Sequence, residues 1–426
     1  MKIASVVLLA FILFSAKQAQ SAALPVWHGF IEQDYGGLLS EDALIKHKNY
    51  NMLEQRFQLK TRYAIPAENI LSYWNGVLVY KGDFVVDEYF QTTASYELRE
   101  LNLVVSPNKI MDLKAGRQVL TWGTGDYIFV NDMFPKDYIS FYIGRDDEYL
   151  KKPSDALRLY FYPQGVNIDF VLIPFFTPNT IPDGDRVSSF DSFERGIAGR
   201  KTERNAVKPA HKARNIQYAW RLYRNIGNTE CAFYYFRGFD PSPKSYLDEA
   251  RHQLFYERLD VYGSSVRGPF LGGIGNVEMG YLRSRQDNKG DNRLIENSML
   301  KWLFGYEKDL GNDLKIGLQY FFEQRLNYSN YTANLLANDY FLDEYHHVLT
   351  QRITKLYRNQ TVMLGLFNFW SPSDKDGYLR LSGAYDISDQ WKLTVGVNLP
   401  WGEDNLTDFG MMKKNKNFFV RLRYSF

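Results

Sequence analysis

The carboxyl end of the chain, NFFVRLRYSF at residues 417–426, alternates strictly between two kinds of side chain. In an extended strand, neighbouring side chains point to opposite faces. One face is apolar and the other is largely polar, with Phe418, Val420, Leu422, Tyr424 and Phe426 on the first and Phe419, Arg421, Arg423 and Ser425 on the second. The core face of a soluble sandwich rarely carries two arginines. The pattern is typical of a membrane-barrel strand that meets lipid on one face and a water-filled lumen on the other.

Composition favours the same class of protein. Aromatic residues make up 16% of the chain, as expected where aromatic girdles mark two membrane interfaces. Mean hydropathy is −0.38, and beyond the N-terminal segment no apolar run approaches the roughly 20 residues of a membrane helix. A terminal strand ending Tyr-x-Phe, here residues 424–426, resembles the assembly signal of bacterial outer-membrane β-barrels. The resemblance implies that the barrel-assembly machinery recognises Phe426 and that outer-membrane lipid surrounds the strands.

The rest of the chain divides into segments of about ten residues with a period of two, which predicts an all-β fold. We expect a transmembrane antiparallel β-barrel of about 18 strands, with 16 as the alternative count. The predicted strands are Val26–Gly36, Asn49–Tyr63, Ile70–Phe84, Thr93–Val105, Lys109–Thr121, Asp155–Tyr162, Val166–Phe175, Ala213–Arg224, Asn228–Gly238, Ala250–Gly263, Gly275–Arg285, Asn297–Lys308, Leu314–Arg325, Glu344–Tyr357, Gln360–Trp370, Gly377–Tyr385, Gln390–Leu399 and Asn417–Phe426. A soluble all-β sandwich is the alternative fold with similar strands.

Connection lengths test this count, because short periplasmic turns should alternate with long extracellular loops. The short connections include 106–108, 163–165, 226–227, 310–313, 358–359 and 387–389. The long ones include 122–154, 176–212, 327–342 and 400–416. With 18 strands, all the short connections fall on one side and all the long ones on the other.

The N-terminus predicts export. Met1-Lys2 precedes an apolar stretch, Ile3–Phe14, and then small and polar residues, so residues 1–22 are predicted to be a signal peptide, with cleavage between Ser21 and Leu24. A membrane anchor is the weaker alternative, because the apolar stretch is too short to span. We therefore expect residues 23–426 to form a single barrel in the bacterial outer membrane. Loss of Lys2 and Lys17 lowers Lys+Arg from 51 to 49, which equals the 49 Asp+Glu.

Alternation also predicts which charges line the lumen. The candidate pore-lining residues are Arg56, Lys60, Arg62, Lys114, Arg117, Arg158, Arg221, Lys315, Arg325, Arg380, Lys392, Arg421 and Arg423. The same assignment places Arg258 and Asp260 inside. An excess of basic groups would concentrate anions in the lumen. Alternatively, these charges pair across strands and brace the wall.

The loop Phe176–Lys212 is the candidate constriction. Its last part, residues 200–212, carries a run of basic residues against a single acid, Glu203, and the constriction candidates are Arg200, Lys201, Arg204, Lys208 and Lys212. A loop with this charge bias can fold inward and narrow a pore. A solvated surface loop is the alternative that such a composition also allows.

The densest motif is GRQVLTWG, residues 116–123, of the form GRQ-x-x-x-WG. It resembles a motif of alginate-export-type porins, and the resemblance covers one strand and its loop. It implies a monomeric barrel with a charged lumen that conducts polar, often anionic solutes or polysaccharide. Strict alternation from Lys114 places Gln118 inside and Arg117 outside, so a pore role for Arg117 requires a bulge near Gly116. We interpret the acidic cluster that follows, Arg145-Asp146-Asp147-Glu148, as a solvated loop, with a divalent cation bound between strands or lipid headgroups as the alternative.

Enzymatic chemistry has no support in the sequence. The six histidines lack metal-ligand spacing and have no evident serine or acid partner, and no phosphate-binding or haem-attachment motif is present. We expect no catalytic residue, metal, cofactor or nucleic-acid partner. The sequence favours a channel for passive diffusion or export of small polar, anionic solutes or an acidic polymer. The alternative is a non-conducting scaffold that sheathes or docks a partner protein, such as an electron-transfer subunit. Oligomeric state stays open.

Overall fold

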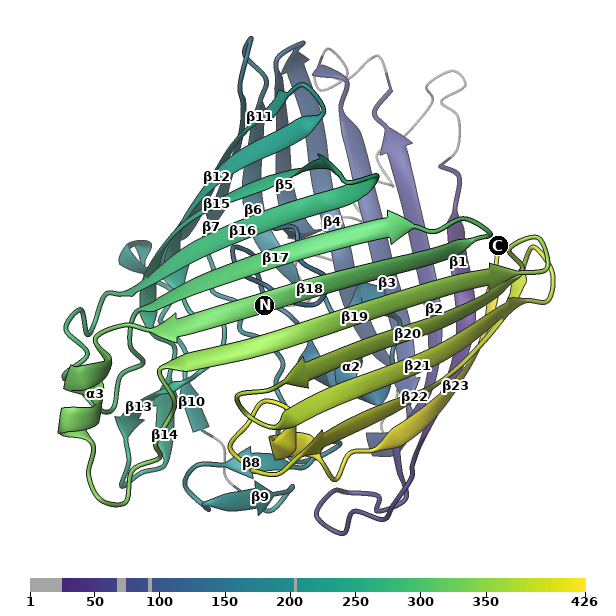
Figure 1. Ribbon diagram of the computed structural model, residues 1–426. Helices are drawn as coiled ribbons and strands as arrows, with labels where there is room; N and C mark the ends of the chain where they lie inside the picture. The colour runs from purple at the N-terminus through teal and green to yellow at the C-terminus, as the bar shows by residue number, and fades with distance from the viewer. Residues whose placement is uncertain (1–24, 67–73, 91–93, 203–204) are drawn as a thin grey trace.

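The structure is a computed structural model that describes residues 25–66, 74–90, 94–202 and 205–426. The signal peptide predicted for residues 1–22 lies outside the described residues. Eighteen antiparallel strands form one closed barrel, shown in Figure 1. Its closure is direct, because β1 (His28–Leu38) pairs with β23 (Asn417–Ser425) from Phe30↔Ser425 to Leu38↔Asn417. The count of 18 is confirmed, and closure leaves no free sheet edge, which excludes the sandwich.

Every strand of the barrel pairs with the next barrel strand along the chain. The remaining strands are β2 (Tyr50–Ala64), β3 (Val77–Asp87), β4 (Ser95–Asn108), β5 (Met111–Val119), β6 (Pro153–Phe161), β7 (Asn167–Ile173), β11 (Gln217–Ile226), β12 (Thr229–Phe239), β15 (Arg258–Phe270), β16 (Gly273–Ser284), β17 (Met299–Asp309), β18 (Leu314–Arg325), β19 (Tyr345–Tyr357), β20 (Val362–Ser371), β21 (Asp376–Asp386) and β22 (Trp391–Gly402).

The short connections named above lie at one end of the barrel and the long ones at the other, as predicted, although the short connection 372–375 lies with the long ones. We call these ends the turn end and the loop end. The loop end, at the bottom of Figure 1, carries a small sheet of β10 (Asn205–Val207), β13 (Ser245–Asp248) and β14 (Gln253–Phe255), the hairpin of β8 (Ser189–Asp191) and β9 (Gly196–Ala198), and the helix α3 (Tyr328–Asn334).

One predicted strand is wrong in its position. The segment Ala250–Gly263 was expected to be a strand, but β15 runs from Arg258 to Phe270 and turns back at Leu271-Gly272. Gly272 has φ of +75°, a conformation that glycine adopts without strain. Residues 250–257 belong instead to the loop that carries β14. The sequence of this loop resembles a strand, so the predicted strand begins too early in the chain.

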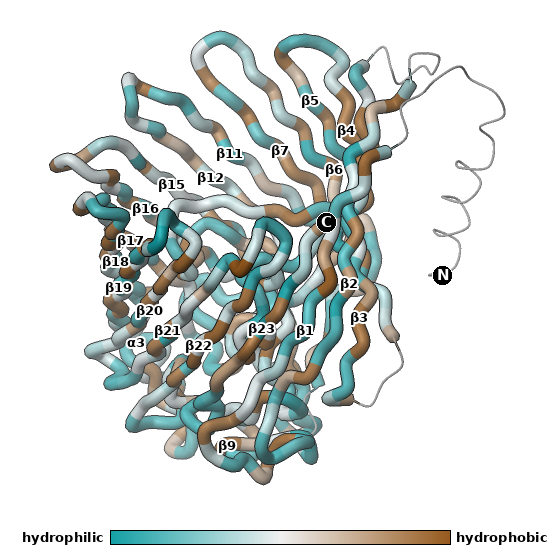
Figure 2. Tube along the Cα trace, turned by 90° about the vertical axis from the view of Figure 1, so that its right-hand side faces the viewer, coloured by the Kyte–Doolittle hydropathy of each residue, from teal (hydrophilic) through white to brown (hydrophobic). Residues whose placement is uncertain are grey.

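The two faces of the wall differ as the alternation predicts. On β23, Val420 and Leu422 are 37% and 38% exposed on the outer face, while Phe419 and Arg421 are buried inside. Figure 2 shows the same alternation of apolar and polar residues along the strands. Among the residues that the structure describes, no helix is both long and apolar enough to cross a membrane.

Candidate functional site: the interior of the barrel

The inner face of the wall is defined by charged residues that are opposite one another on neighbouring strands. Glu32 on β1 faces Arg56 on β2 and Arg423 on β23. Following the register around the barrel places every pore-lining candidate on this face except one. The residues on the inner face are Arg56, Lys60, Arg62, Lys114, Arg158, Arg221, Lys315, Arg325, Arg380, Lys392, Arg421 and Arg423.

The exception is Arg117, which lies on the outer face. Its Nε is 3.2 Å from a carboxylate oxygen of Asp155, directly across the β5–β6 pair. That register runs from Met111 to Val119 without a bulge, so alternation is preserved and Gln118 points inside. Arg258 and Asp260 also lie outside, because the inner face of β15 is formed by the odd-numbered residues Leu259 and Val261. The shifted start of β15 explains this error.

The constriction candidates lie at the loop end. Arg200, Lys201, Lys208 and Lys212 are exposed there, and Arg204 lies outside the described residues. The same loop does send a short stretch inward, although through different residues. Arg186 is buried and approaches Glu54 at 3.2 Å, and Val187 is fully buried beside Met52.

A different segment, residues 120–152, fills much of the barrel interior, and we call it the inner loop. Its start is fixed by Trp122, whose indole NH donates to Asp169 at 2.9 Å and whose ring packs edge-on against Phe134 at 5.0 Å between centroids. Both rings lie in an apolar cluster with the inner faces of β6, β7, β11, β12, β15 and β16. The motif 116–123 therefore serves to lead the chain from the wall into the lumen.

Two further apolar contacts hold the middle of the inner loop. Phe141 and Leu150 pack against aromatic and aliphatic side chains of β17–β21, in a cluster that includes Leu303 and Tyr378. On the other side, Ile143 packs with Phe419 in a smaller cluster. The inner loop therefore touches the wall in several directions, as expected for a segment with a fixed position rather than a solvated chain.

Local sequence explains the shape of the inner loop. The helix α2 (Tyr138–Ile143) begins after Asp137, whose carboxylate accepts from the Ser140 backbone NH at 3.1 Å. It ends at Gly144, which has φ of +87° and where a Cβ would be 2.3 Å from the Phe419 ring. Only glycine satisfies both the left-handed conformation and this close approach to the wall.

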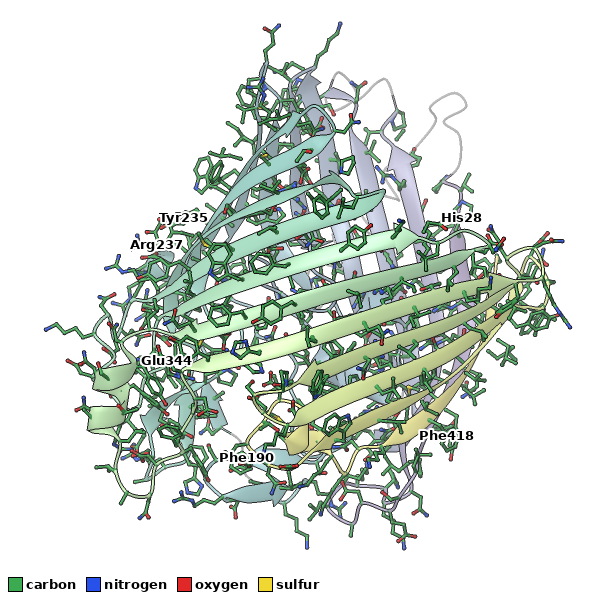
Figure 3. All side chains as sticks on the ribbon, in the orientation of Figure 1. His28, Phe190, Tyr235, Arg237, Glu344 and Phe418 are labelled. Carbon is green, nitrogen blue, oxygen red and sulfur yellow. The ribbon has the colours of Figure 1, made fainter. Side chains whose placement is uncertain are left out.

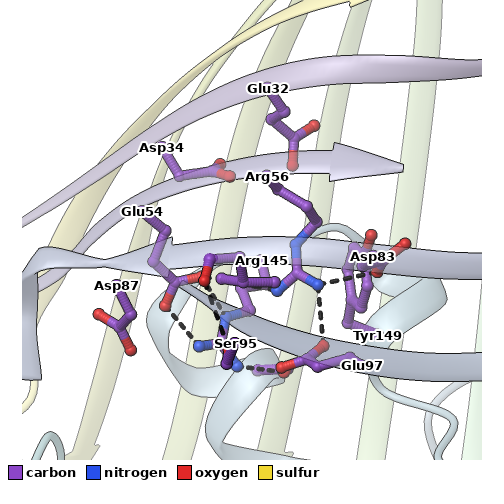
Figure 4. A network of polar contacts seen from close by, with 12 residues as sticks. Glu32, Asp34, Glu54, Arg56, Asp83, Asp87, Ser95, Glu97, Arg145 and Tyr149 are labelled. Carbon is purple, nitrogen blue, oxygen red and sulfur yellow. Dashed lines mark hydrogen bonds and ion pairs between the residues drawn. The ribbon is translucent and has the colours of Figure 1, made fainter. Parts of the chain in front are cut away.

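A network of ion pairs joins the inner loop to β2, β3 and β4, as Figure 4 shows. Glu54 is fully buried and contacts three guanidinium groups, those of Arg145, Arg186 and Arg56, with the last at 3.7 Å. Arg56 in turn bonds to Asp83 at 2.8 Å and to Glu97 at 2.9 Å. Although burial favours its neutral form, Glu54 raises the pKa of Arg145 above its ordinary range.

The acidic run of the inner loop completes this network. Asp146 pairs with Arg423 at 3.0 Å, Asp147 with Arg380 at 3.2 Å, and Glu148 with Lys81 at 2.6 Å. Burial alone would raise the pKa of Glu148, but Lys81, Gln58 and Arg99 together hold it at about 2. The expectation of a solvated acidic loop is therefore wrong. In the described part of the chain, no group of three His, Cys, Asp or Glu side chains is arranged to hold a metal ion.

Sequence reasoning missed Arg186, Arg145 and Lys81 as interior residues. Neither Arg186 nor Arg145 belongs to a barrel strand, so alternation does not place them. One signal was available: Glu54, Asp83 and Asp87 lie on the loop-end half of the inner faces of β2 and β3, where Arg56 is the one basic residue of the two strands. Buried carboxylates without cations are costly, so such an excess indicates that basic groups must arrive from another segment.

Basic side chains remain exposed on the inner wall toward the turn end. Lys60, Arg62 and Lys315 are exposed on that face, and among the described residues none of the three forms an ion pair. Between residues 124–126 of the inner loop and β15–β19 lies a polar cavity of about 50 Å³, lined in part by Arg267, Arg352 and Glu307. The interior therefore combines a neutralised network near the loop end with accessible positive charge near the turn end.

Comparison with known proteins identifies the fold. No protein-family model matches the chain, and no curated protein is similar in sequence. Among solved structures, Pseudomonas aeruginosa OccK11 (OpdR) aligns with a TM-score of 0.54 at 10% identity, over 94% of this chain and 95% of that one. Acinetobacter baumannii OccAB4 aligns with a TM-score of 0.57 at 9% identity, over 96% of this chain and 100% of that one. The chain therefore shares the fold of these outer-membrane porin barrels.

Proposed function

We propose that the protein is a bacterial outer-membrane channel for passive diffusion of small polar solutes, with a preference for anions. The carrying observation is a closed barrel whose inner wall is charged on nearly every strand while its outer wall is mostly apolar. Eighteen strands enclose more space than side chains alone can fill. The inner loop occupies part of that space, which favours small solutes over a polymer.

Anion preference is supported by where the unpaired charge lies. The acids deep in the lumen, such as Glu32, Asp34 and Glu54, are buried and paired with arginines. Lys60, Arg62 and Lys315 are exposed on the turn-end wall, so a permeating ion meets their charge with water around it. A cavity lined by one sign of charge raises the local concentration of the opposite ion.

The test is ion selectivity in planar bilayers under a salt gradient. We expect discrete conductance with a reversal potential on the anion side. The triple variant K60Q/R62Q/K315Q should move that potential toward zero. The control K375Q, which removes a charge from an exposed loop residue paired with Glu403, should leave it unchanged. Absence of any conductance would overturn the proposal of a channel and favour the scaffold alternative. Conductance with cation selectivity would overturn only the proposed anion preference.

We also propose that Phe426 is the residue read by the barrel-assembly machinery. Its side chain is 45% exposed on the outer wall, and its ring stacks on Phe57 at 6.0 Å. Its backbone exchanges two hydrogen bonds of 3.0 Å with Gly29. F426A should lower the amount of folded protein in outer membranes several-fold, while F418A, an outward aromatic of the same strand, should lower it less. Equal amounts of folded F426A and parent would contradict this role.

A further inference from the structure

Five arginines gather at the loop end of β11, β12, β15 and β16: three are on the outer face of these strands, one lies in the helical turn before β11, and one directly follows β16. We call them the arginine patch, and they are Arg214, Arg237, Arg258, Arg283 and Arg285. The strand register brings three of them together. Arg237 is opposite Asp260, Asp260 is opposite Arg283, and Arg258 lies two residues before Asp260 on β15. Figure 3 shows Arg237 projecting outward from the barrel beside Tyr235.

The patch has more positive charge than its surroundings neutralise. Asp260 is the one acid that pairs with it in the described chain, at 3.7 Å from Arg237 and 3.7 Å from Arg285. Arg258 bonds instead to a neutral amide, Asn215 Oδ1, at 2.6 Å. The Nε of Arg283 likewise donates to the amide oxygen of Asn288 at 3.0 Å. Five arginines against one aspartate leave an excess of four positive charges.

The arginines also lie close to one another. Arg258 donates to the backbone carbonyl of Arg214 at 3.5 Å, and Arg237 and Arg285 share Asp260. Like charges held together cost free energy unless an anion lies between them. Guanidinium groups bind phosphate in bidentate geometry, which makes phosphate the anion that suits such a cluster.

A row of tyrosines lies next to the patch on the same outer face, on the side nearer the middle of the barrel. Tyr218, Tyr235, Tyr262 and Tyr281 occupy β11, β12, β15 and β16, one on each strand. Their ring centroids are separated in turn by 6.1, 5.1 and 6.3 Å. Tyrosines at this position are typical of the boundary between lipid headgroups and acyl chains.

The outward residues beyond the tyrosines, toward the middle of the barrel, are apolar except for Ser264 on β15. Phe233 is 66% exposed, Val266 47% and Trp220 41%. On β12 the outward side chains therefore run Arg237, Tyr235 and Phe233, from the loop end toward the middle of the barrel. This order of charge, phenol and hydrocarbon matches the headgroup, interface and acyl region of a single lipid.

The patch is confined to one side of the barrel. On the described strands β22 and β23, the outward residues near the loop end include Trp401, Leu399 and Phe418, and no charged residue lies on the outer face of either strand. A general attraction of the barrel to membrane would not need this asymmetry. The patch also faces outward rather than into the bore, so a permeating solute does not pass over it.

We propose that the arginine patch binds the phosphate groups of an anionic glycolipid in the leaflet that surrounds the loop end. The arginines hold the phosphates, the tyrosine row contacts the sugars, and the apolar residues nearer the middle of the barrel contact the acyl chains. The proposal rests on the barrel spanning the outer membrane, and it is independent of conductance.

The experiment measures lipid retention by the folded protein in detergent, using native mass spectrometry after incubation with diphosphoryl lipid A. The test variant is R258Q/R283Q, because neither arginine pairs with Asp260 and the fold should tolerate both changes. The control, R251Q/K375Q, removes the same charge from exposed loop residues outside the patch. A difference in electrophoretic mobility between heated and unheated samples confirms that each variant is folded.

We expect the apparent affinity of R258Q/R283Q for diphosphoryl lipid A to fall at least tenfold, with R251Q/K375Q within twofold of the parent. Lipid A stripped of its phosphates should bind parent and variant equally weakly. Equal binding of diphosphoryl lipid A by parent and R258Q/R283Q would overturn the site. Complete displacement of the lipid by millimolar inorganic phosphate would overturn its assignment to a lipid, because the patch would then hold a soluble anion.

Discussion

The inner loop is held in two different ways on its two sides. Toward β6–β16 it is held mainly by packing, with Trp122 and Phe134 in an apolar cluster. Toward β1–β4 and β23 it is held mainly by ion pairs, with Arg145 on Glu54 and Asp146 on Arg423. The inner loop thus packs against an apolar cluster on one side and pairs with charged residues on the other.

The difference separates position from selectivity. Apolar packing fixes a segment without requiring any countercharge, and it costs little to bury. Buried ion pairs add little net stability, yet each becomes costly when one partner is removed. We infer that the packed side sets where the inner loop lies. The ionic side sets the charge and hydration of the part of the lumen that the inner loop leaves open.

The largest effect is expected from Glu54, which three guanidinium groups share. E54Q leaves these buried cations without their counterion, and we expect the free energy of unfolding to fall by about 3–5 kcal/mol. Loss of the contacts between Glu54 and these guanidinium groups should also increase the noise of the open-channel current. Urea unfolding in detergent and single-channel recording measure the two effects. An unchanged unfolding midpoint would show that the ionic side does not hold the inner loop.

A smaller loss is expected on the packed side from W122F. Phenylalanine keeps the aromatic packing but removes the hydrogen bond to Asp169, which is charged and buried. Hydrogen bonds to charged groups contribute about 1.5–3 kcal/mol. The same urea experiment measures the loss. Because the ionic side is untouched, ion selectivity should not change, and a shifted reversal potential would break the proposed division.

The third effect appears only in acid. The pKa of Glu148 is about 2 in the folded protein, below its ordinary value of 4.5. The stabilisation from its ionised form is therefore complete above pH 4.5 and is lost as the pH falls toward 2. Urea unfolding between pH 6 and pH 2 should show the difference in free energy of unfolding between the parent and E148Q shrinking once the pH falls below 4.5. As a control, E41Q changes an exposed pair with Lys48 and should behave like the parent.

The smallest effect is expected at the turn end. Lys392 pairs with Asp386 at 3.1 Å, with 47% and 42% of the two side chains exposed. Exposed pairs contribute about 0–1 kcal/mol, so K392Q should barely alter the unfolding midpoint. It should instead shift the reversal potential slightly away from anions. A loss as large as that of E54Q would remove the distinction between the buried network and the exposed wall.

The strands were predictable because their pattern is local. Membrane barrels repeat every two residues, so Leu314–Arg325 could be assigned exactly from its own sequence and is β18 in the structure. Parity also placed Arg117 outside, correctly, against the pore role that its motif suggested. The count of strands followed from the alternation of short and long connections, which depends on no distant contact.

The contents of the lumen were not predictable in the same way. Whether Asp146, Asp147 and Glu148 meet water or arginines depends on residues far away in the chain, such as Arg423, Arg380 and Lys81. Loop residues have no period that points them inward. Only the unbalanced acids on β2 and β3 indicated that a cationic segment had to enter the barrel, and they did not indicate which one.

The seam between β1 and β23 has a consequence for how the molecule matures. Glu32 and Asp34 are supplied early in synthesis, but the arginines that neutralise them, Arg423 and Arg421, lie nearly 400 residues further along the chain. Until β23 docks, Asp34 is opposite another acid, Glu54, and lacks its arginine, whereas Glu32 already has Arg56 opposite it. The charges at this seam are therefore balanced only when the two ends of the barrel meet.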